Sequence, residues 1–343
     1  MMPGGPPERG KGGTAQTMAK AIRIHEHGGP EVLRLEEVDP GTPGPGQALI
    51  RQTAAGLNFI DVYHRTGLYP VPSLPAVIGS EGAGVVEAVG EGVTDVALGD
   101  RVVYSMSLGG YAEQRVVDAG RLVRLPDGIS DRQAAGMMLK GCTVQYLLRR
   151  IYPVKAGDTI LLHAAAGGVG LIACQWAKHL GATVIGTVGS DEKAELARRH
   201  GCDHPIVYTR EDVVERVKAL TDGAGVPVVF DSVGKDTFMA SLDCLRPRGL
   251  MVSYGNASGA VEPFSPAILA AKGSLFLTRP TLASYIATRA ELDATAADLF
   301  AVVESGGVRI EVSQAMPLKD AAQAHRDLEA RKTTGSTVLL MEG

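Results

Sequence analysis

An apolar run, a turn of very small residues, a run with helical apolar spacing and a second apolar run follow one another within residues 159–188. The turn matches the pattern G-x-G-x-x-G with alanine at the first place, because Ala165, Gly167 and Gly170 occupy the three positions. We expect Gly167 to let the backbone approach a pyrophosphate and Gly170 to let the helix pack closely on the strand. The free N–H groups at the helix start would bind the anion. This order therefore predicts a dinucleotide-binding fold.

The end of the second strand indicates which dinucleotide binds. NAD sites carry an Asp or Glu about 20 residues after the first glycine, and residues 185–188 contain no carboxylate. Small residues there leave room for a 2′-phosphate, and the residues expected to surround or bind it are Gly189, Ser190, Lys193 and Tyr208. The alternative is that Lys193 is a solvated charge on a helix that also carries Asp191, Glu192 and Glu195. The missing acid favours NADPH over NADH.

From residue 158 onwards, stretches typical of strands and of helices alternate. Strands are predicted at 159–163, 182–188, 205–208, 226–230, 249–254 and 273–278, and helices near 168–180, 191–200, 211–220, 235–244 and 265–271. This pattern predicts the α/β class with a Rossmann-type, doubly wound parallel sheet. Ligands lie beyond the carboxyl ends of such strands, so we expect these residues after the fourth and fifth strands to approach the cofactor: Ser232, Tyr254, Gly255, Asn256 and Ser258.

The remainder of the chain has a different rhythm. Residues 20–125 form short apolar or alternating runs broken by Gly, Pro and Asp, which indicates a compact β-barrel-like domain. Helices are predicted at 131–139, 143–151 and 289–304, and the apolar runs at 308–312 and 337–341 are expected to rejoin the first domain. The domains predicted are therefore 18–141 with 279–343, and 142–278, while the Gly- and Pro-rich residues 1–17 are predicted to be a disordered tail.

Composition excludes several classes of function. The formal net charge of −4 argues against a nucleic-acid surface built on bulk charge. The sequence contains no run of 18 or more apolar residues, so it predicts no membrane span. Four scattered cysteines (Cys142, Cys174, Cys202 and Cys244) indicate reduced thiols in a cytoplasmic protein.

Several phrases resemble the medium-chain dehydrogenase/reductase superfamily, and within it the zeta-crystallin-like NADPH:quinone oxidoreductases. They are Gly-Leu-Asn-Phe-Ile-Asp at 56–61, Gly-Leu-Tyr-Pro at 67–70, Gly-Ser-Glu-Gly-Ala-Gly-Val at 79–85, Leu-Gly-Asp-Arg-Val at 98–102 and Lys-Gly-Cys-Thr-Val at 140–144. The resemblance implies a GroES-like β-barrel catalytic domain beside the Rossmann domain. It also implies a homodimer, with edge pairing of the strand at 273–278 as one route.

The same comparison of motifs predicts a site without a metal. Zinc enzymes of the superfamily carry a Cys where Asn58 stands and a His where Ser80 stands. Catalytic zinc needs three protein ligands and an open position. The pairs His25–His27 (on a predicted strand) and His200–His204 are better explained as surface or structural residues. Without a Lewis acid, a quinone or conjugated carbonyl is a better acceptor than a simple alcohol or ketone.

By resemblance, Asn58, Asp61, Tyr63 and Tyr69 would line the cleft near the nicotinamide, and either tyrosine would donate a hydrogen bond or proton to the quinone oxygen. Packing at the domain boundary is the alternative role for both tyrosines. The residues that would contact the cofactor are Lys140, Thr143, Ala166, Gly167, Gly168, Val169 and Gly170, and Arg331 would bind the 2′-phosphate. The alternative for Arg331 is a surface charge beside Lys332.

Three hypotheses follow. The first is an NADPH-dependent, zinc-independent quinone reductase that holds the nicotinamide against the acceptor and excludes water. The second is a zinc-free reductase of enals, enones or enoyl compounds. The third is a non-enzymatic NADPH-binding structural or RNA-binding protein, against which the acidic balance of the chain weighs.

Overall fold

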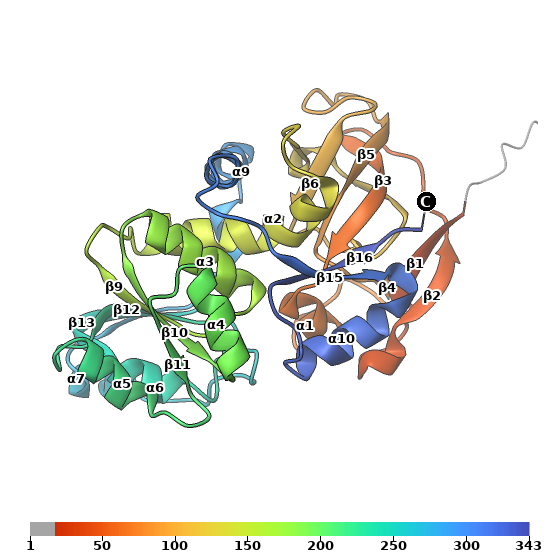
Figure 1. The fold of residues 1–343 in the computed structure, drawn as a ribbon. Helices are drawn as coiled ribbons and strands as arrows, with labels where there is room; N and C mark the ends of the chain where they lie inside the picture. The colour runs from red at the N-terminus through yellow and green to blue at the C-terminus, as the bar shows by residue number, and fades with distance from the viewer. Residues whose placement is uncertain (1–17, 343) are drawn as a thin grey trace, which may run out of the picture.

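The structure is a computed structural model that describes residues 18–342, so the predicted tail at 1–17 lies outside the described residues. Figure 1 shows two lobes, one built around strands β9 to β13 and the other around β1 to β6 with β15 and β16. Helix α2 (Asp131–Gln145) runs from one lobe into the other.

The first lobe contains two sheets within the described chain. The order of one is β2-β1-β4, and that of the other is β15-β16-β3-β5-β6-β8, with β7 paired to β3. Their bounds are β1 Ala19–Ile24, β2 Arg34–Val38, β3 Gln47–Gly56, β4 Ala76–Val77, β5 Glu81–Val89, β6 Arg101–Ser105, β7 Gln114–Asp118, β8 Val123–Arg124, β15 Val312–Pro317 and β16 Ser336–Leu340. Because β16 pairs antiparallel with β3, the C-terminal segment lies in the same sheet as the N-terminal strands.

The second lobe is a parallel sheet with the order β11-β10-β9-β12-β13-β14. The strands are β9 Thr159–Leu162, β10 Thr183–Val188, β11 His204–Val207, β12 Val226–Asp231, β13 Leu245–Ser253 and β14 Phe276–Thr278. The helices between them are α3 Gly168–His179, α4 Asp191–Arg199, α5 Val213–Leu220, α6 Phe238–Asp243 and α7 Ala267–Ala271. The predicted doubly wound sheet is confirmed, and its order reverses between β9 and β12, where such sheets bind ligands.

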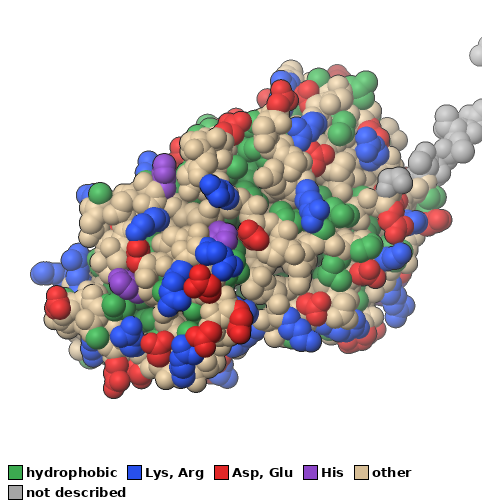
Figure 2. Space-filling model, in the orientation of Figure 1, with side chains coloured by type: hydrophobic (Ala, Val, Ile, Leu, Met, Phe, Trp, Pro, Cys, Tyr) green, Lys and Arg blue, Asp and Glu red, His purple; other side chains and the backbone are tan. Residues whose placement is uncertain are grey.

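The remaining helices are α1 Phe59–Thr66, α8 Leu282–Tyr285, α9 Arg289–Glu304 and α10 Ala321–Glu329, with single 3-10 turns at Pro30–Val32, Ala119–Arg121 and Leu318–Asp320. No helix in the described part of the chain is long and apolar enough to cross a membrane. On the face shown in Figure 2, acidic and basic side chains are interspersed.

Two local predictions were wrong. The two helices expected at 131–139 and 143–151 are one helix, α2, which continues into a π-helical segment, Tyr146–Ile151. Gly141 lies within this helix, and because a Cβ there would lie 2.4 Å from Leu299 Cδ1, the glycine allows close packing of α2 on α9. The predicted boundary at 141/142 falls within α2, so that division of the chain stays a prediction. His25 and His27 lie beyond β1, which ends at Ile24, and not on a strand.

Candidate functional site

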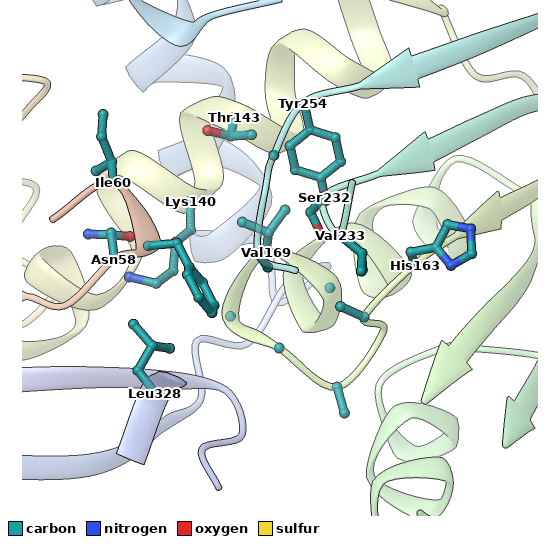
Figure 3. A pocket seen from close by; sticks show the side chains of 18 of the residues that line it. Asn58, Ile60, Lys140, Thr143, His163, Val169, Ser232, Val233, Tyr254 and Leu328 are labelled. Atoms are coloured by element: carbon teal, nitrogen blue, oxygen red, sulfur yellow. The ribbon is translucent and has the colours of Figure 1, made fainter. Parts of the chain in front are cut away.

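A cavity of about 610 Å³ lies where the two lobes meet, at the carboxyl ends of the central parallel strands. Residues that follow β9, β10, β12 and β13 line one side of it, and residues of α1, α2 and the segment 328–337 line the other. Figure 3 shows Lys140 and Asn58 close together on one side of Val169, with Ser232 and Tyr254 on the other side. A cavity of this size and position is typical of a binding site for a cofactor and a small substrate.

The glycine turn forms the floor of this cavity, and its residues Ala166, Gly167, Gly168, Val169 and Gly170 all line it. At position 170 a Cβ would lie 2.3 Å from the carbonyl oxygen of Ala164, so only glycine lets α3 start so close to the strand. At position 167 the nearest atom to a Cβ would be 3.3 Å away, which leaves this backbone open to a ligand. The residues present therefore fit a pyrophosphate at the start of α3.

Helix α2 adds two of the predicted residues, Lys140 and Thr143, to the lining. They are three positions apart and therefore lie on one face of the helix. The Lys140 stem lies against Gly168, where a Cβ would be 2.8 Å from Lys140 Cδ. The first lobe also touches the turn, because the Gly335 N–H donates to the Ala166 carbonyl at 3.0 Å. Both lobes thus frame the predicted pyrophosphate position.

The corner predicted to hold a 2′-phosphate contains Gly189, Lys193, Tyr208 and Arg331. The Tyr208 hydroxyl lies over Gly189, since a Cβ there would be 2.8 Å from it. Lys193 Nζ donates to the Arg331 carbonyl at 2.6 Å, and Arg331 Nη2 lies 3.5 Å from Asp236 Oδ2. Burial, followed by the Arg331 charge, lowers the pKa of Lys193. Two cations from different lobes therefore meet where an anion would stabilise both.

Three predicted cofactor residues lie outside the lining: Ser190, Asn256 and Ser258. The Ser190 hydroxyl instead caps α4 by accepting the Lys193 N–H at 3.3 Å. Ser258 Oγ donates to the Val233 carbonyl at 2.9 Å and accepts the Asp236 N–H at 3.0 Å. The cofactor contact of these three residues therefore stays a prediction, whereas Ser232, Tyr254 and Gly255 do line the cavity.

His163 directly follows β9, lines the cavity and was not predicted as a site residue. Its ring is buried, with Nδ1 2.9 Å from Thr187 Oγ1 and Nε2 2.9 Å from Ser241 Oγ. Ser241 Oγ donates to Asp231 Oδ2 at 2.8 Å. Because Ser241 donates its proton to Asp231, Nε2 of His163 must be the donor in its hydrogen bond to Ser241 Oγ. Burial lowers the pKa of the His163 ring. The network fixes the ends of three strands beneath the cofactor position.

Asn58 and Lys140 are joined through a buried carboxylate. Glu81 Oε2 accepts from Asn58 Nδ2 at 2.8 Å and from Lys140 Nζ at 3.2 Å, and Oε1 accepts the Leu139 N–H at 2.7 Å. An amide and an ammonium thus share one oxygen of a buried carboxylate. This donor set does not fit zinc. Within residues 18–342, no group of three His, Cys, Asp or Glu residues is arranged to hold a metal ion.

Asp61 does not line the cavity, contrary to the prediction. Its carboxylate is fully buried and accepts the Asn58 N–H and the Tyr111 hydroxyl, each at 2.9 Å. Burial raises the pKa of Asp61 to about 6, against the opposing effect of these hydrogen bonds. Asp61 therefore caps α1 and positions Asn58 from beneath.

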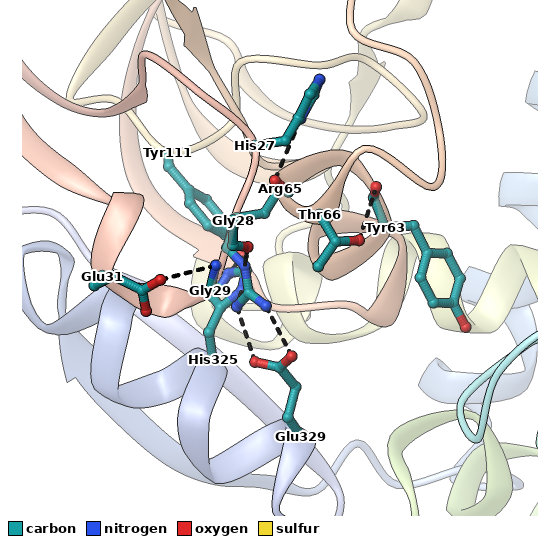
Figure 4. Close-up of polar contacts among 10 residues, drawn as sticks. All are labelled: His27, Gly28, Gly29, Glu31, Tyr63, Arg65, Thr66, Tyr111, His325 and Glu329. Carbon is teal, nitrogen blue, oxygen red and sulfur yellow. Dashed lines mark hydrogen bonds and ion pairs between the residues drawn. The ribbon is translucent and has the colours of Figure 1, made fainter.

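A buried arginine anchors α1 to α10. Arg65 is 1% exposed and donates to both carboxylate oxygens of Glu329, at 2.9 and 2.7 Å. His325 lies between Arg65 and Tyr111, 3.1 Å from Arg65 Nη1 and 3.3 Å from the Tyr111 hydroxyl. Figure 4 shows this network, with the Tyr63 ring pointing away from it. The same helix α10 places Leu328 in the cavity lining and precedes Arg331. The Arg65–Glu329 ion pair therefore fixes the lower wall of the site.

The two predicted tyrosines lie together at the opposite end from Lys193. The rings of Tyr63 and Tyr69 are 5.1 Å apart, and the Tyr63 hydroxyl accepts the Asn256 N–H at 3.0 Å across the two lobes. Burial raises the pKa of Tyr63 to about 12. Arg279, a lining residue that the sequence did not indicate, donates through Nη2 to the Tyr69 hydroxyl at 3.2 Å. Tyr146 also lines this end.

Two family models match the chain. The alcohol dehydrogenase GroES-like domain matches residues 44–127 and the zinc-binding dehydrogenase matches residues 168–300. A quinone oxidoreductase of Pseudomonas aeruginosa is 57% identical over 324 residues, which are 94% of this chain and 100% of that protein. A 2-haloacrylate reductase of a Burkholderia species is 49% identical, over 94% of this chain and 99% of that protein.

The solved structures agree with these relatives. The crystal structure of Escherichia coli quinone oxidoreductase complexed with NADPH superposes with a TM-score of 0.93 at 52% identity, and the match covers 94% of this chain and 100% of that one. The predicted combination of a GroES-like domain and a Rossmann-type sheet is therefore confirmed.

Proposed function

This chain belongs to the medium-chain dehydrogenase/reductase family, in its quinone oxidoreductase branch, and we propose that it reduces quinones with NADPH and without zinc. The observation that carries the proposal is the cavity between the lobes, with a glycine turn and two cations at one end and phenol hydroxyls at the other. NADPH, when bound, supplies the hydride that, with one proton, converts a quinone to a hydroquinone. The protein's task is then to position both partners and exclude water.

Most of the predicted residues that line the cavity have a part in this proposal. The turn 166–170 and Lys140 would hold the pyrophosphate, and Lys193, Tyr208 and Arg331 the 2′-phosphate. Thr143, Ser232, Tyr254 and Gly255 would lie along the nicotinamide half. The Tyr63 oxygen already accepts the Asn256 N–H, so its own O–H is available to donate to the acceptor oxygen. Asn58 would act as a fixed wall, held by Glu81.

Zinc independence rests on residues rather than on composition. The Lys140 ammonium, 7% exposed at its side chain, forms an ion pair with Glu81, which is fully buried. A divalent cation placed beside that carboxylate would have to displace the ammonium, and it would gain an amide in place of the thiolate that zinc prefers. The buried ion pair therefore supplies the local charge balance that a metal would otherwise supply.

Reduction of a conjugated carbon–carbon double bond is the second candidate. The Burkholderia relative is named as a reductase of 2-haloacrylate. The acceptor end of the cavity combines hydrogen-bond donors with the apolar side chains of Ile60, Met106 and Leu139, which suits an enone as well as a quinone. The hydride would go to the β-carbon and a proton to the α-carbon.

The test compares acceptors under one set of conditions. Oxidation of NADPH and of NADH is measured with a para-benzoquinone, an ortho-quinone and an enal, each with and without a chelator. We expect NADPH with a quinone to give the highest kcat/KM and the chelator to have no effect. A faster reaction with the enal would favour the second candidate, and chelator sensitivity would contradict zinc independence.

We also propose a cytoplasmic homodimer. All four cysteines are buried and free, and unpaired thiols are typical of proteins in the reducing cytoplasm. Strand β14 is an edge of the parallel sheet, and its Phe276 is 61% exposed. Edge strands with exposed apolar residues pair readily with another copy.

A further inference from the structure

Arg279 is a cation of the cavity without a carboxylate partner in the described structure. Each of the other lining cations has a protein partner. Lys140 forms an ion pair with Glu81, and Arg331 faces Asp236. Lys193 donates to a backbone carbonyl in the predicted 2′-phosphate corner. The only acid among the described lining residues is Asp236, at that same corner. The acceptor end therefore carries a positive charge that the protein does not neutralise.

The groups around Arg279 reinforce this imbalance. Its Nη2 donates to the Tyr69 hydroxyl at 3.2 Å, and in the amide orientation that satisfies Asn256, also to that side-chain oxygen at 3.3 Å. Nη1 donates to the Pro280 carbonyl at 3.1 Å. These are neutral partners that orient the guanidinium without cancelling its charge.

The phenols supply further donors. Tyr69 and Tyr63 each accept a hydrogen bond, from Arg279 and from the Asn256 N–H, so their own O–H groups remain to donate. Electrostatic attraction by Arg279 acts on Tyr63 and on Tyr146, against the larger effect of burial, which raises the pKa of both phenols. Donors converge here from α1, from the loop after it and from the segment after β14.

We propose that Arg279 recognises a carboxylate on the electron acceptor, so that the preferred substrates are quinones that carry an acidic side group. This inference rests on the proposed quinone reduction and names the substrate class of the same site. The guanidinium presents paired N–H donors that match a carboxylate. Reduction itself is balanced as before: the quinone takes the hydride and one proton and becomes a hydroquinone, while the carboxylate is unchanged.

The experiment uses para-benzoquinone-acetate and its methyl ester, which differ in charge but share the reducible ring. In the wild-type enzyme we expect kcat/KM for the acid to exceed that for the ester by about tenfold, the contribution of a charge-assisted contact at a partly exposed position. In Arg279→Gln this acid-to-ester ratio falls to about one, and Arg279→Lys restores part of it. Arg132→Gln, an exposed charge on α2, leaves the ratio unchanged.

Binding provides a readout besides turnover. Calorimetric titration of the NADP⁺-loaded enzyme with the hydroquinone of the acid should give about tenfold weaker binding for Arg279→Gln, while the Kd for NADPH of each variant checks that the fold is intact. An acid-to-ester ratio near one in the wild type, or one that Arg279→Gln leaves intact, overturns the assignment while quinone reduction stands. Failure to reduce either quinone contradicts the proposed function itself.

Discussion

Lys193 tests the cofactor preference at the scale of one residue. In Lys193→Ala we expect the affinity for NADPH to fall about tenfold to a hundredfold with little change for NADH, because only the 2′-phosphate would form a charge-assisted contact with this ammonium. The contact replaces the bond from Lys193 Nζ to the Arg331 carbonyl. Fluorescence titration with both cofactors measures it, and Lys218→Ala, exposed on α5, is the control. Equal losses for both cofactors would contradict the 2′-phosphate site.

Asp61 gives a pH dependence whose sign follows from its burial. Its pKa in the folded protein is about 6 against an ordinary 3.8, so the folded state holds the proton more tightly than the unfolded state. Protonation therefore stabilises the fold at low pH, and this contribution is lost as pH rises from about 4 to about 6. The variant Asp61→Asn is neutral at every pH. When the pH is raised from about 5 to about 8, the wild type should therefore lose about 1 kcal/mol of unfolding free energy relative to this variant.

Urea unfolding of both proteins at the two pH values measures this difference. The comparison cancels the opposing contribution of His325, whose pKa burial lowers to about 3 from an ordinary 6.5, so that it stabilises the fold progressively as pH rises between these two values. A difference between the two proteins that does not depend on pH would show that Asp61 is charged when buried.

Residues such as Asp61 mark the limit of reasoning from sequence. Asn58 lines the cavity, but spacing does not say that Asp61 points back to the N–H of Asn58 and away from the cavity. Ser190 and Ser258 show the same limit, because spacing does not reveal that their hydroxyls also bond to a helix start and a loop. No sequence pattern predicted Arg279 as a site residue. It follows a short edge strand, and only the fold brings it into contact with Tyr69, 210 positions away.

At the scale of the element, the two glycines of the turn before α3 have different roles: Gly170 is needed for stability and Gly167 for cofactor binding. In Gly170→Ala the new Cβ would meet the Ala164 carbonyl at 2.3 Å, so the backbone must shift, and we expect a loss of about 1–3 kcal/mol in unfolding free energy. In Gly167→Ala the Cβ would lie 3.3 Å from the Ala164 carbonyl oxygen, a contact that a small shift relieves, so we expect a smaller stability loss than in Gly170→Ala while the Kd for NADPH rises. Thermal unfolding and fluorescence titration of both variants distinguish the two roles. Equal stability losses would show that neither glycine is reserved for the ligand.

Elements were predictable where local periodicity and packing agree. The strands and helices from β9 to β13 follow the sequence pattern closely because the central strands β9, β10 and β12 are buried on both faces and the helices that cover them on one. The sequence pattern predicted two helices where the structure has the single helix α2, which contains Gly141. Only the position of Leu299, 158 residues further on, shows that this glycine is needed for the contact of two helices.

At the scale of the whole molecule, the cofactor site depends on both lobes and on the anchor between α1 and α10. Arg65→Met removes a buried guanidinium and leaves Glu329, 35% exposed, able to turn toward water. We expect a loss of about 3 kcal/mol in unfolding free energy because the Tyr111–His325 network also loses its partner. We also expect weaker NADPH binding, since α10 positions the segment that carries Arg331. Urea unfolding and cofactor titration measure the two effects, and unchanged values of both would contradict the anchor.

The oligomeric state is the property that depends most on the surface of the whole molecule, and strand β14 provides its test. A second copy that pairs along β14 would extend the parallel sheet and cover Phe276, which is 61% exposed. In Phe276→Lys we expect the dimer to dissociate, because a lysine on an edge strand opposes pairing with another copy. Leu98→Lys, at a residue 73% exposed in the other lobe, is the matched control and should leave the mass unchanged. Sedimentation velocity measures both, and a variant at position 276 that stays dimeric would assign the contact to another surface.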